Sequence, residues 1–211
     1  MSMTRRTLGR LAALLLSIAA LGAHAQAKAP EALIKEVSTD VLEAVKADKT
    51  IQAGDIRKVI ALVDQKVLPY VNFQRMTSSA VGRYWRQATP EQQKRLQEEF
   101  KLLLVRTYSG ALSQVSSEQT VELRPMRSTP ADNEVVVRTE IKGKGDPIQL
   151  DYRLEKAGDS WKIYDVNVLG VWLVENYRNS FAQEIGANGI DGLIAKMAER
   201  NKSAAAAGAK S

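Results

Sequence analysis

The 211-residue sequence contains no cysteine and a single histidine, His24. Without cysteine the chain has no disulfide, so burial of apolar side chains must hold the fold together. The absence of thiolates also excludes a Cys-His nucleophile, a cysteine cluster and a cysteine-ligated zinc site. The chain is long enough to close one core of ordinary size, and we predict a single domain.

Long apolar runs are also scarce, and the longest one lies at the N-terminus. Residues 11–21 are apolar and follow three arginines, and small residues flank His24 on both sides. This arrangement is typical of a secretory signal peptide with an A-x-A cleavage site. The alternative is a membrane anchor, but this run is much shorter than the roughly 20 residues that a spanning helix needs. We therefore predict export and removal of residues 1–25 by cleavage after Ala25.

Removal of the signal peptide changes both the charge and the available chemistry. The chain has 30 basic and 24 acidic residues, and three of the arginines are lost, so the net charge falls from +6 to +3. A mildly basic, exported chain gives no electrostatic argument for binding nucleic acid. Loss of the histidine excludes a Ser-His-Asp triad and a His-ligated zinc site. No phosphate-binding loop or dinucleotide-binding motif is present, so we predict a protein that is not an enzyme and needs no metal or cofactor.

The first half of the mature chain has the period of amphipathic helices, with apolar side chains at three- and four-residue steps. The spacing predicts four helical segments, over residues 30–48, 55–69, 70–87 and 89–114. The last of them begins with Thr89 and has Pro90 at its first position and Gln92 at its third. This is the pattern of a capping box, which makes that helix the most secure prediction in the sequence.

After Ser116 the period changes to two. Residues 133–142 and 148–156 alternate, so that their apolar side chains share one face. Two further strands, over residues 120–126 and 160–168, and the short links between all four predict an antiparallel meander. Since a sheet with one apolar face must be covered, we expect the helices to cover it. The predicted fold class is α+β, with N-terminal helices packed on one face of a curved four-stranded antiparallel sheet, followed by C-terminal helices.

The helical period returns after Gly170. An apolar stripe runs over residues 171–185, and a last short helix is predicted over residues 188–200. Residues 201–211 are small or polar, and we predict that they form a disordered tail. The predicted organisation is a signal peptide at 1–25, one domain at 26–200 and this tail.

An ordered set of segments resembles a known family. GRYWRQATPEQQKRLQEEF at 82–100, WKIYDVNVLGVWLVENYRNSF at 161–181 and GIDGLI at 189–194 are similar to periplasmic phospholipid carriers of the outer-membrane lipid-asymmetry system, the MlaC or toluene-tolerance type. The family often has Asp where this chain has Asn72, and often Ser where it has Trp172. Trp172 either narrows the expected cavity or covers it from outside.

The resemblance implies a soluble periplasmic shuttle that holds the acyl chains of a phospholipid, its cargo, in an apolar cavity between the sheet and the helices. It also implies two partners. One is an inner-membrane ABC transporter complex with its substrate-binding domain subunit, and the other is an outer-membrane lipoprotein complex.

Inward-facing apolar residues of the strands and adjoining helices are the candidate lipid contacts, although ordinary core packing is the default for any one of them. The predicted lipid-binding residues are Leu103, Leu104, Tyr108, Val135, Val137, Ile141, Leu150, Tyr152, Leu154, Tyr164, Val166, Val171 and Val174. Arg83 and Arg86 flank two aromatic residues. They are candidates for binding a headgroup or docking a partner, with a solvated turn as the alternative.

Asp165 offers the main alternative function. A carboxylate beside Tyr164 in an apolar wall resembles the acid and base sites of cone-shaped α+β isomerases. Strict alternation puts Asp165 on the face of Trp161 and Ile163. The alternative to a lipid carrier is therefore a small-ligand binder or an isomerase that uses Asp165, and a structural hydrogen bond is the simpler interpretation of this single carboxylate.

Overall fold

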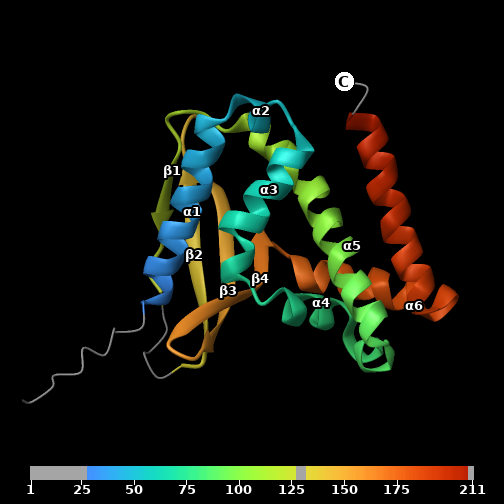
Figure 1. Ribbon diagram of the computed structural model, residues 1–211. Coiled ribbons are helices and arrows are strands. Elements are labelled where there is room, and N and C mark those ends of the chain that lie inside the picture. Colours follow the sequence, from blue (N-terminus) through green and yellow to red (C-terminus); the bar gives the residue numbers. More distant parts are fainter. Residues whose placement is uncertain (1–27, 127–131, 209–211) are drawn as a thin grey trace, which may run out of the picture.

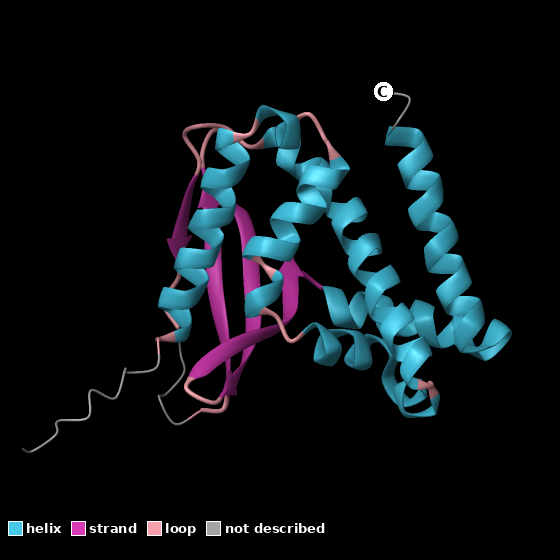
Figure 2. Ribbon diagram, in the orientation of Figure 1, coloured by secondary structure: helices cyan, strands magenta, loops and turns pink. Residues whose placement is uncertain are grey.

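The computed structural model describes residues 28–126 and 132–208. In this part of the chain, an antiparallel sheet carries helices over one of its faces (Figures 1 and 2). The predicted signal peptide lies outside the described residues. Among the helices of the described ranges, none is both long enough and apolar enough to span a bilayer.

The helices of the first half follow the predicted segments closely. They are α1 (Pro30–Ala47), α2 (Lys49–Gln52), α3 (Ile56–Lys66), η1 (Leu68–Tyr70), α4 (Phe73–Val81), η2 (Gly82–Gln87), α5 (Pro90–Tyr108) and η3 (Ser109–Gln114), where η marks a 3-10 helix. The capping box of α5 is confirmed, because Thr89 and Gln92 each accept a hydrogen bond from the other's backbone N–H. Asn72 caps α4 by accepting from the backbone of Arg75 at 3.0 Å.

The sheet contains the four predicted strands and one more. The strands are β1 (Thr120–Leu123), β2 (Glu134–Lys142), β3 (Ile148–Ala157), β4 (Ser160–Val168) and β5 (Val171–Trp172), all antiparallel and in sequence order. Leu169 and Gly170 both have positive φ, 52° and 91°. A two-residue loop in which both φ angles are positive is a favoured β-hairpin turn, because its backbone matches the right-handed twist of the two strands that it joins. The chain therefore folds back onto β4, and Val171 and Trp172 are strand residues rather than the start of the predicted helix.

The last element of the described residues is α6 (Leu173–Gly208), which is interrupted at Gly189, where φ is 71°. The interruption separates the two predicted C-terminal helices. The prediction of a disordered tail from residue 201 was wrong as far as Gly208, because alanine favours helix and no proline interrupts it. Asn201 is buried and donates to the backbone oxygen of Glu99 at 3.0 Å, which ties this extension to α5.

Three groups of buried side chains form the core. The helical cluster joins α4, α5 and α6, and Phe100 there packs edge-on against Tyr177 and Phe181. The α1–sheet cluster joins Leu33, Ile34 and Val37 of α1 to the strands. The α3 cluster joins the ends of α1 and α5 to α2 and α3. Val71 and Val166 pack against both the helical cluster and the α1–sheet cluster.

Candidate functional site

A cavity of about 360 Å³ occupies the space between the sheet and the helices. It is lined by Val63, Val67, Leu68, Val71, Phe73, Met76, Lys101, Leu104, Val105, Tyr108, Ala111, Leu112, Val115, Gln119, Ile141, Ile148, Leu150, Val166, Val168 and Leu173. Apart from Lys101, Gln119 and the hydroxyl of Tyr108, these side chains are apolar. Such a wall suits an apolar ligand and offers very little to a charged one.

One wall of the cavity is half of the inner sheet face. This open half consists of Ile141, Ile148, Leu150, Val166 and Val168, and all five side chains are half-buried. Strand pairing places Ile141 opposite Ile148 and Leu150 opposite Val168. Alternation along the strands explains why these residues point to the same side.

The other half of the same sheet face is filled. This closed half consists of Val135, Val137 and Leu154, which are 5%, 0% and 0% exposed and pack in the α1–sheet cluster. Tyr152 packs against this cluster, and its hydroxyl lies 3.3 Å from that of Ser38 on α1. The inner face is thus sealed where α1 covers it and open where α1 does not.

The helical wall is divided between neighbouring residues of α5. Leu104 and Tyr108 face the cavity, whereas Leu103 is buried in the helical cluster. Burial raises the pKa of the Tyr108 hydroxyl, so this group stays neutral at physiological pH. Lys101 is held by Asp64, with Nζ 2.8 Å from Oδ1. The wall therefore presents no unpaired charge to the cavity.

The structure brings together five of the predicted lipid-binding residues. Leu104, Tyr108, Ile141, Leu150 and Val166 line the cavity. Six others are packed elsewhere: Val135, Val137, Tyr152 and Leu154 belong to or contact the closed half, and Leu103 and Val174 lie in the helical cluster. The prediction that these six side chains point inward is confirmed. The apolar pattern alone does not show whether an inward-facing side chain packs against other side chains or borders a cavity.

The remaining two predicted residues do not line the cavity. Val171 belongs to β5 and is 48% exposed. A shift of register between Arg153 and Leu154 leaves Tyr164 as the extra residue of β4, which is the geometry of a β-bulge. Tyr164 donates to Glu134 at 2.9 Å, and the guanidinium of Arg75 lies 3.6 Å from the centre of its ring.

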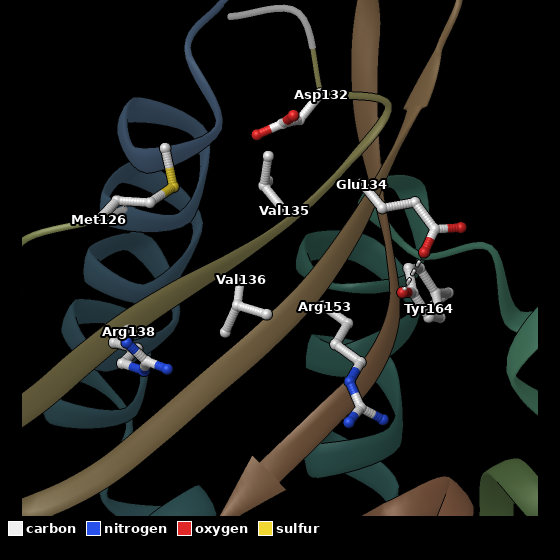
Figure 3. Close-up of a pocket in the computed structure, with 8 residues that line it drawn as sticks. All are labelled: Met126, Asp132, Glu134, Val135, Val136, Arg138, Arg153 and Tyr164. Carbon is white, nitrogen blue, oxygen red and sulfur yellow. Dashed lines mark hydrogen bonds between the residues drawn. The ribbon is translucent and has the colours of Figure 1, made fainter. Parts of the chain in front are cut away.

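Tyr164 instead helps to line a separate pocket of about 410 Å³ on the sheet face that α1 does not cover (Figure 3). Arg138 and Arg153 stand beside Val136 in this view, and Glu134 reaches across to the Tyr164 hydroxyl. Side chains alternate between the two faces of β2, so its polar residues lie on this outer face while Val135 and Val137 lie on the inner one. Charged walls make the outer pocket unsuited to acyl chains.

Asp165 is a structural hydrogen-bond acceptor and does not line the cavity. Its Oδ1 accepts from the backbone N–H groups of Val166 at 2.9 Å and Val174 at 3.0 Å, and its Oδ2 accepts from Arg153 at 2.9 Å. The side chain is 1% exposed, and this burial raises the pKa of the carboxyl group while the hydrogen bonds oppose the shift. Asp165 thus joins β4 to the first turn of α6.

Trp172 covers this junction from outside. The guanidinium of Arg153 lies 3.8 Å from the centre of the indole ring, in a cation–π contact. Trp172 is not among the residues that line the cavity, so it does not narrow it. Asn72 is the second position at which the chain differs from the residue common in the family that it resembles. Its side chain donates to Glu155 at 2.6 Å and also caps α4.

Arg83 and Arg86 lie on η2, outside the cavity wall, and both are exposed. Arg83 donates to the hydroxyl of Tyr84 at 2.9 Å and its guanidinium lies 4.9 Å from the centre of that ring. Within the described residues, no group of acidic or histidine side chains is arranged to hold a metal ion.

Sequence reasoning missed much of the cavity wall. Ile148 and Val168 share the face of Leu150 and were identifiable from alternation. Val63 and Val67 belong to the recognised stripe of α3, but nothing in a helical period indicates whether that stripe packs on side chains or on a cavity. Ala111 and Leu112 lie at the end of the predicted helix over residues 89–114, whose period gives no sign of a cavity either. Gln119 comes from a segment without a clear period, so no sequence signal pointed to it.

The fold and the site together define an α+β domain in which helices and one sheet face enclose an apolar ligand cavity. The sequence profile described as MlaC protein matches residues 35–199, and the chain belongs to this family.

Two characterised relatives and one solved structure are similar over most of the chain. The toluene tolerance protein ttg2D of Pseudomonas putida is 27% identical over 185 residues, which cover 84% of this chain and 86% of that protein. The intermembrane phospholipid transport system binding protein MlaC of Haemophilus influenzae is 26% identical over 172 residues, covering 80% of each. A phospholipid-binding protein from Ralstonia solanacearum, solved in complex with a phospholipid, is 46% identical with a TM-score of 0.79, covering 83% of this chain and 98% of that one.

Proposed function

We propose that the protein is a phospholipid carrier that encloses acyl chains in the apolar cavity. The observation that carries the proposal is the cavity itself, which lies between three packed clusters and has almost wholly apolar walls. The solved relative from Ralstonia solanacearum, which has the same fold, was obtained with a phospholipid bound. The acyl chains of the cargo contact the open half of the sheet face and the cavity-facing side of α5.

The energetics of lipid extraction require an enclosed site. Burial is worth about 0.8 kcal/mol per methylene, so two chains with roughly 28 methylenes are held in a bilayer by something on the order of 20 kcal/mol. A carrier must match most of this, which a surface patch does not. The cavity volume of about 360 Å³ lies near the lower end of sites for drug-sized ligands. We therefore expect the walls to separate when a whole phospholipid enters.

The proposal includes a periplasmic location and two partners. It rests on the predicted signal peptide and on the family, whose Haemophilus influenzae member is named for an intermembrane phospholipid transport system. The chain exchanges lipid with an inner-membrane ABC transporter complex, including its substrate-binding domain subunit, and with an outer-membrane lipoprotein complex. Since the sequence has no nucleotide-binding motif, the partners supply the energy and the direction of transport.

The two arginines of η2 are proposed contacts for a partner or for the exposed headgroup. Both side chains are exposed and neither lines the cavity. Replacing Arg83 and Arg86 by alanine should leave the amount of bound lipid unchanged and slow its transfer to either partner complex. Equal transfer rates for the double variant and the wild type would remove this role.

The direct test of the proposal is to ask what the protein carries from cells. The chain is expressed with its signal peptide, purified from the periplasm without detergent, and extracted with organic solvent. Mass spectrometry should find diacyl phospholipid in stoichiometric amounts. Purified protein that repeatedly contains no phospholipid, and that binds none from vesicles, would contradict the proposal. The isomerase alternative receives no support, because the acceptor atoms of Asp165 are already bonded within the protein.

A further inference from the structure

The cavity contains one polar side chain that is buried and unpaired. Gln119 lies between η3 and β1, is 9% exposed and lines the cavity together with apolar residues. Among the described residues its Oε1 has no hydrogen-bond partner. Leaving a buried amide unpaired costs free energy, so this position calls for an explanation.

The surroundings hold Gln119 in place through its backbone rather than its amide. The carbonyl oxygen accepts from Nζ of Lys46 at 2.7 Å, and the backbone N–H donates to Ser116 at 3.3 Å. The side chain also packs over Gly143, where an added Cβ would lie 2.6 Å from Cγ of Gln119. The backbone and the stem are therefore fixed, whereas Oε1 of the amide is left without a partner among the described residues.

Gln119 also lies on the segment that carries the most exposed part of the cavity wall. Among the described residues that line the cavity, Ala111 of η3 is the one that is exposed. Residues 111, 112, 115 and 119 of this segment all contribute to the wall. A phospholipid that enters beside η3 with its acyl chains first places these chains against the open half of the sheet. Its glycerol and ester region then lies along residues 111–119.

We propose that the amide of Gln119 binds the ester region of the cargo, by donating a hydrogen bond from Nε2 to an acyl-ester carbonyl. This inference deepens the proposed function and rests on it. An ester carbonyl is the polar group closest to the acyl chains, and it accepts hydrogen bonds without donating any. The unpaired buried atom is the acceptor Oε1. A rotation of the terminal amide by about 180° exchanges Oε1 with Nε2, so that the donor takes the buried position and pairs with the ester carbonyl.

The experiment compares two lipids that differ only in this group. Wild-type protein is loaded from vesicles that contain equal amounts of a diester and a diether phosphatidylcholine with the same chains, and the bound ratio is measured by mass spectrometry. The same measurement is made on Gln119→Leu, which keeps a similar volume without the amide. Gln149→Leu is the matched control, because Gln149 is exposed on the outer sheet face, opposite Glu140.

Wild-type protein and Gln149→Leu should prefer the diester lipid by about three- to tenfold, the worth of one neutral hydrogen bond. Gln119→Leu should bind both lipids equally. Its lipid-free form should melt at the same temperature as the wild type or higher, because an unpaired buried amide has been removed. The ratio is internal to each sample, so it does not depend on the total amount of lipid bound.

Three results would overturn the inference and leave the proposed function intact. One is equal binding of both lipids by the wild type, and another is an unchanged preference in Gln119→Leu. The third is a preference of the wild type between ethanolamine and choline headgroups that Gln119→Leu removes while its diester preference persists, which would assign the amide to the headgroup. A wild-type protein that takes up neither lipid would instead contradict the proposed function.

Discussion

The closed and open halves of the inner sheet face are made by the same strands and differ in what lies over them. Leu154 and Leu150 are both leucines of β3, four residues apart, and point to the same side. Leu154 is completely buried beneath α1, whereas Leu150 lines the cavity. One pattern of alternation thus produces either a packed core or the wall of a cavity, depending on the element that covers it.

The largest expected effect comes from the closed half. Leu154→Ala should lower the free energy of unfolding of the lipid-free protein by about 2–5 kcal/mol, because it removes packed atoms and leaves a void. Urea denaturation followed by circular dichroism measures this loss. The lipid bound per folded molecule should not change, and a loss below about 1 kcal/mol would show that the closed half is not packed as described.

The second effect concerns the junction between β4 and α6. Asp165→Ala should destabilise the protein by about 1–3 kcal/mol, because buried backbone N–H groups of Val166 and Val174 lose their acceptor. Hydrogen exchange should show faster opening of the first turn of α6. An unchanged exchange rate there would contradict the capping role. A variant that stays folded and keeps its lipid would further weaken any catalytic interpretation of Asp165.

A smaller effect on stability is expected in the open half. Leu150→Ala, the matched partner of Leu154→Ala, should cost about 1 kcal/mol or less in the lipid-free protein, because the side chain already borders a cavity. Lipid binding should weaken, since the variant removes part of the apolar wall. Titration with vesicles measures the binding. A stability loss equal to that of Leu154→Ala would erase the distinction between the two halves.

The smallest effect on stability is expected from filling the cavity. Val168→Phe adds an aromatic side chain to the open half, and we expect the free energy of unfolding to rise by about 0.5–1 kcal/mol, the usual result of filling a cavity. Lipid uptake should fall sharply because the volume is occupied. Val136→Phe on the outer face is the control and should leave uptake unchanged. Normal uptake by Val168→Phe would place the acyl chains elsewhere.

Local patterns predicted the elements of this fold well. Thr89 and Gln92 identified the start of α5, and alternation placed Val137 and Leu150 on the inner face. The β-bulge at Tyr164 was not predictable in the same way, because it depends on the register of β4 against β3 rather than on either strand alone. The bulge moved Tyr164 to the outer face and set Asp165 opposite Arg153.

The candidate site was less predictable than the fold because a cavity is a property of several elements together. Leu103 and Leu104 are adjacent in sequence, yet one packs in the helical cluster and the other lines the cavity. Gln119 has no periodic context at all. The helix after residue 200 was missed for a different reason, since alanine repeats were interpreted as a tail although alanine favours helix.

The most direct test of the central claim is to map where the acyl chains lie. The protein is loaded with a phosphatidylcholine that carries a photoreactive diazirine near the end of an acyl chain, irradiated, digested and analysed by mass spectrometry. We predict labels on peptides of the open half and of the facing helices, at residues such as Leu150, Val168, Leu104 and Leu112. Labels confined to α1 and the closed half, or to the outer sheet face, would contradict the account.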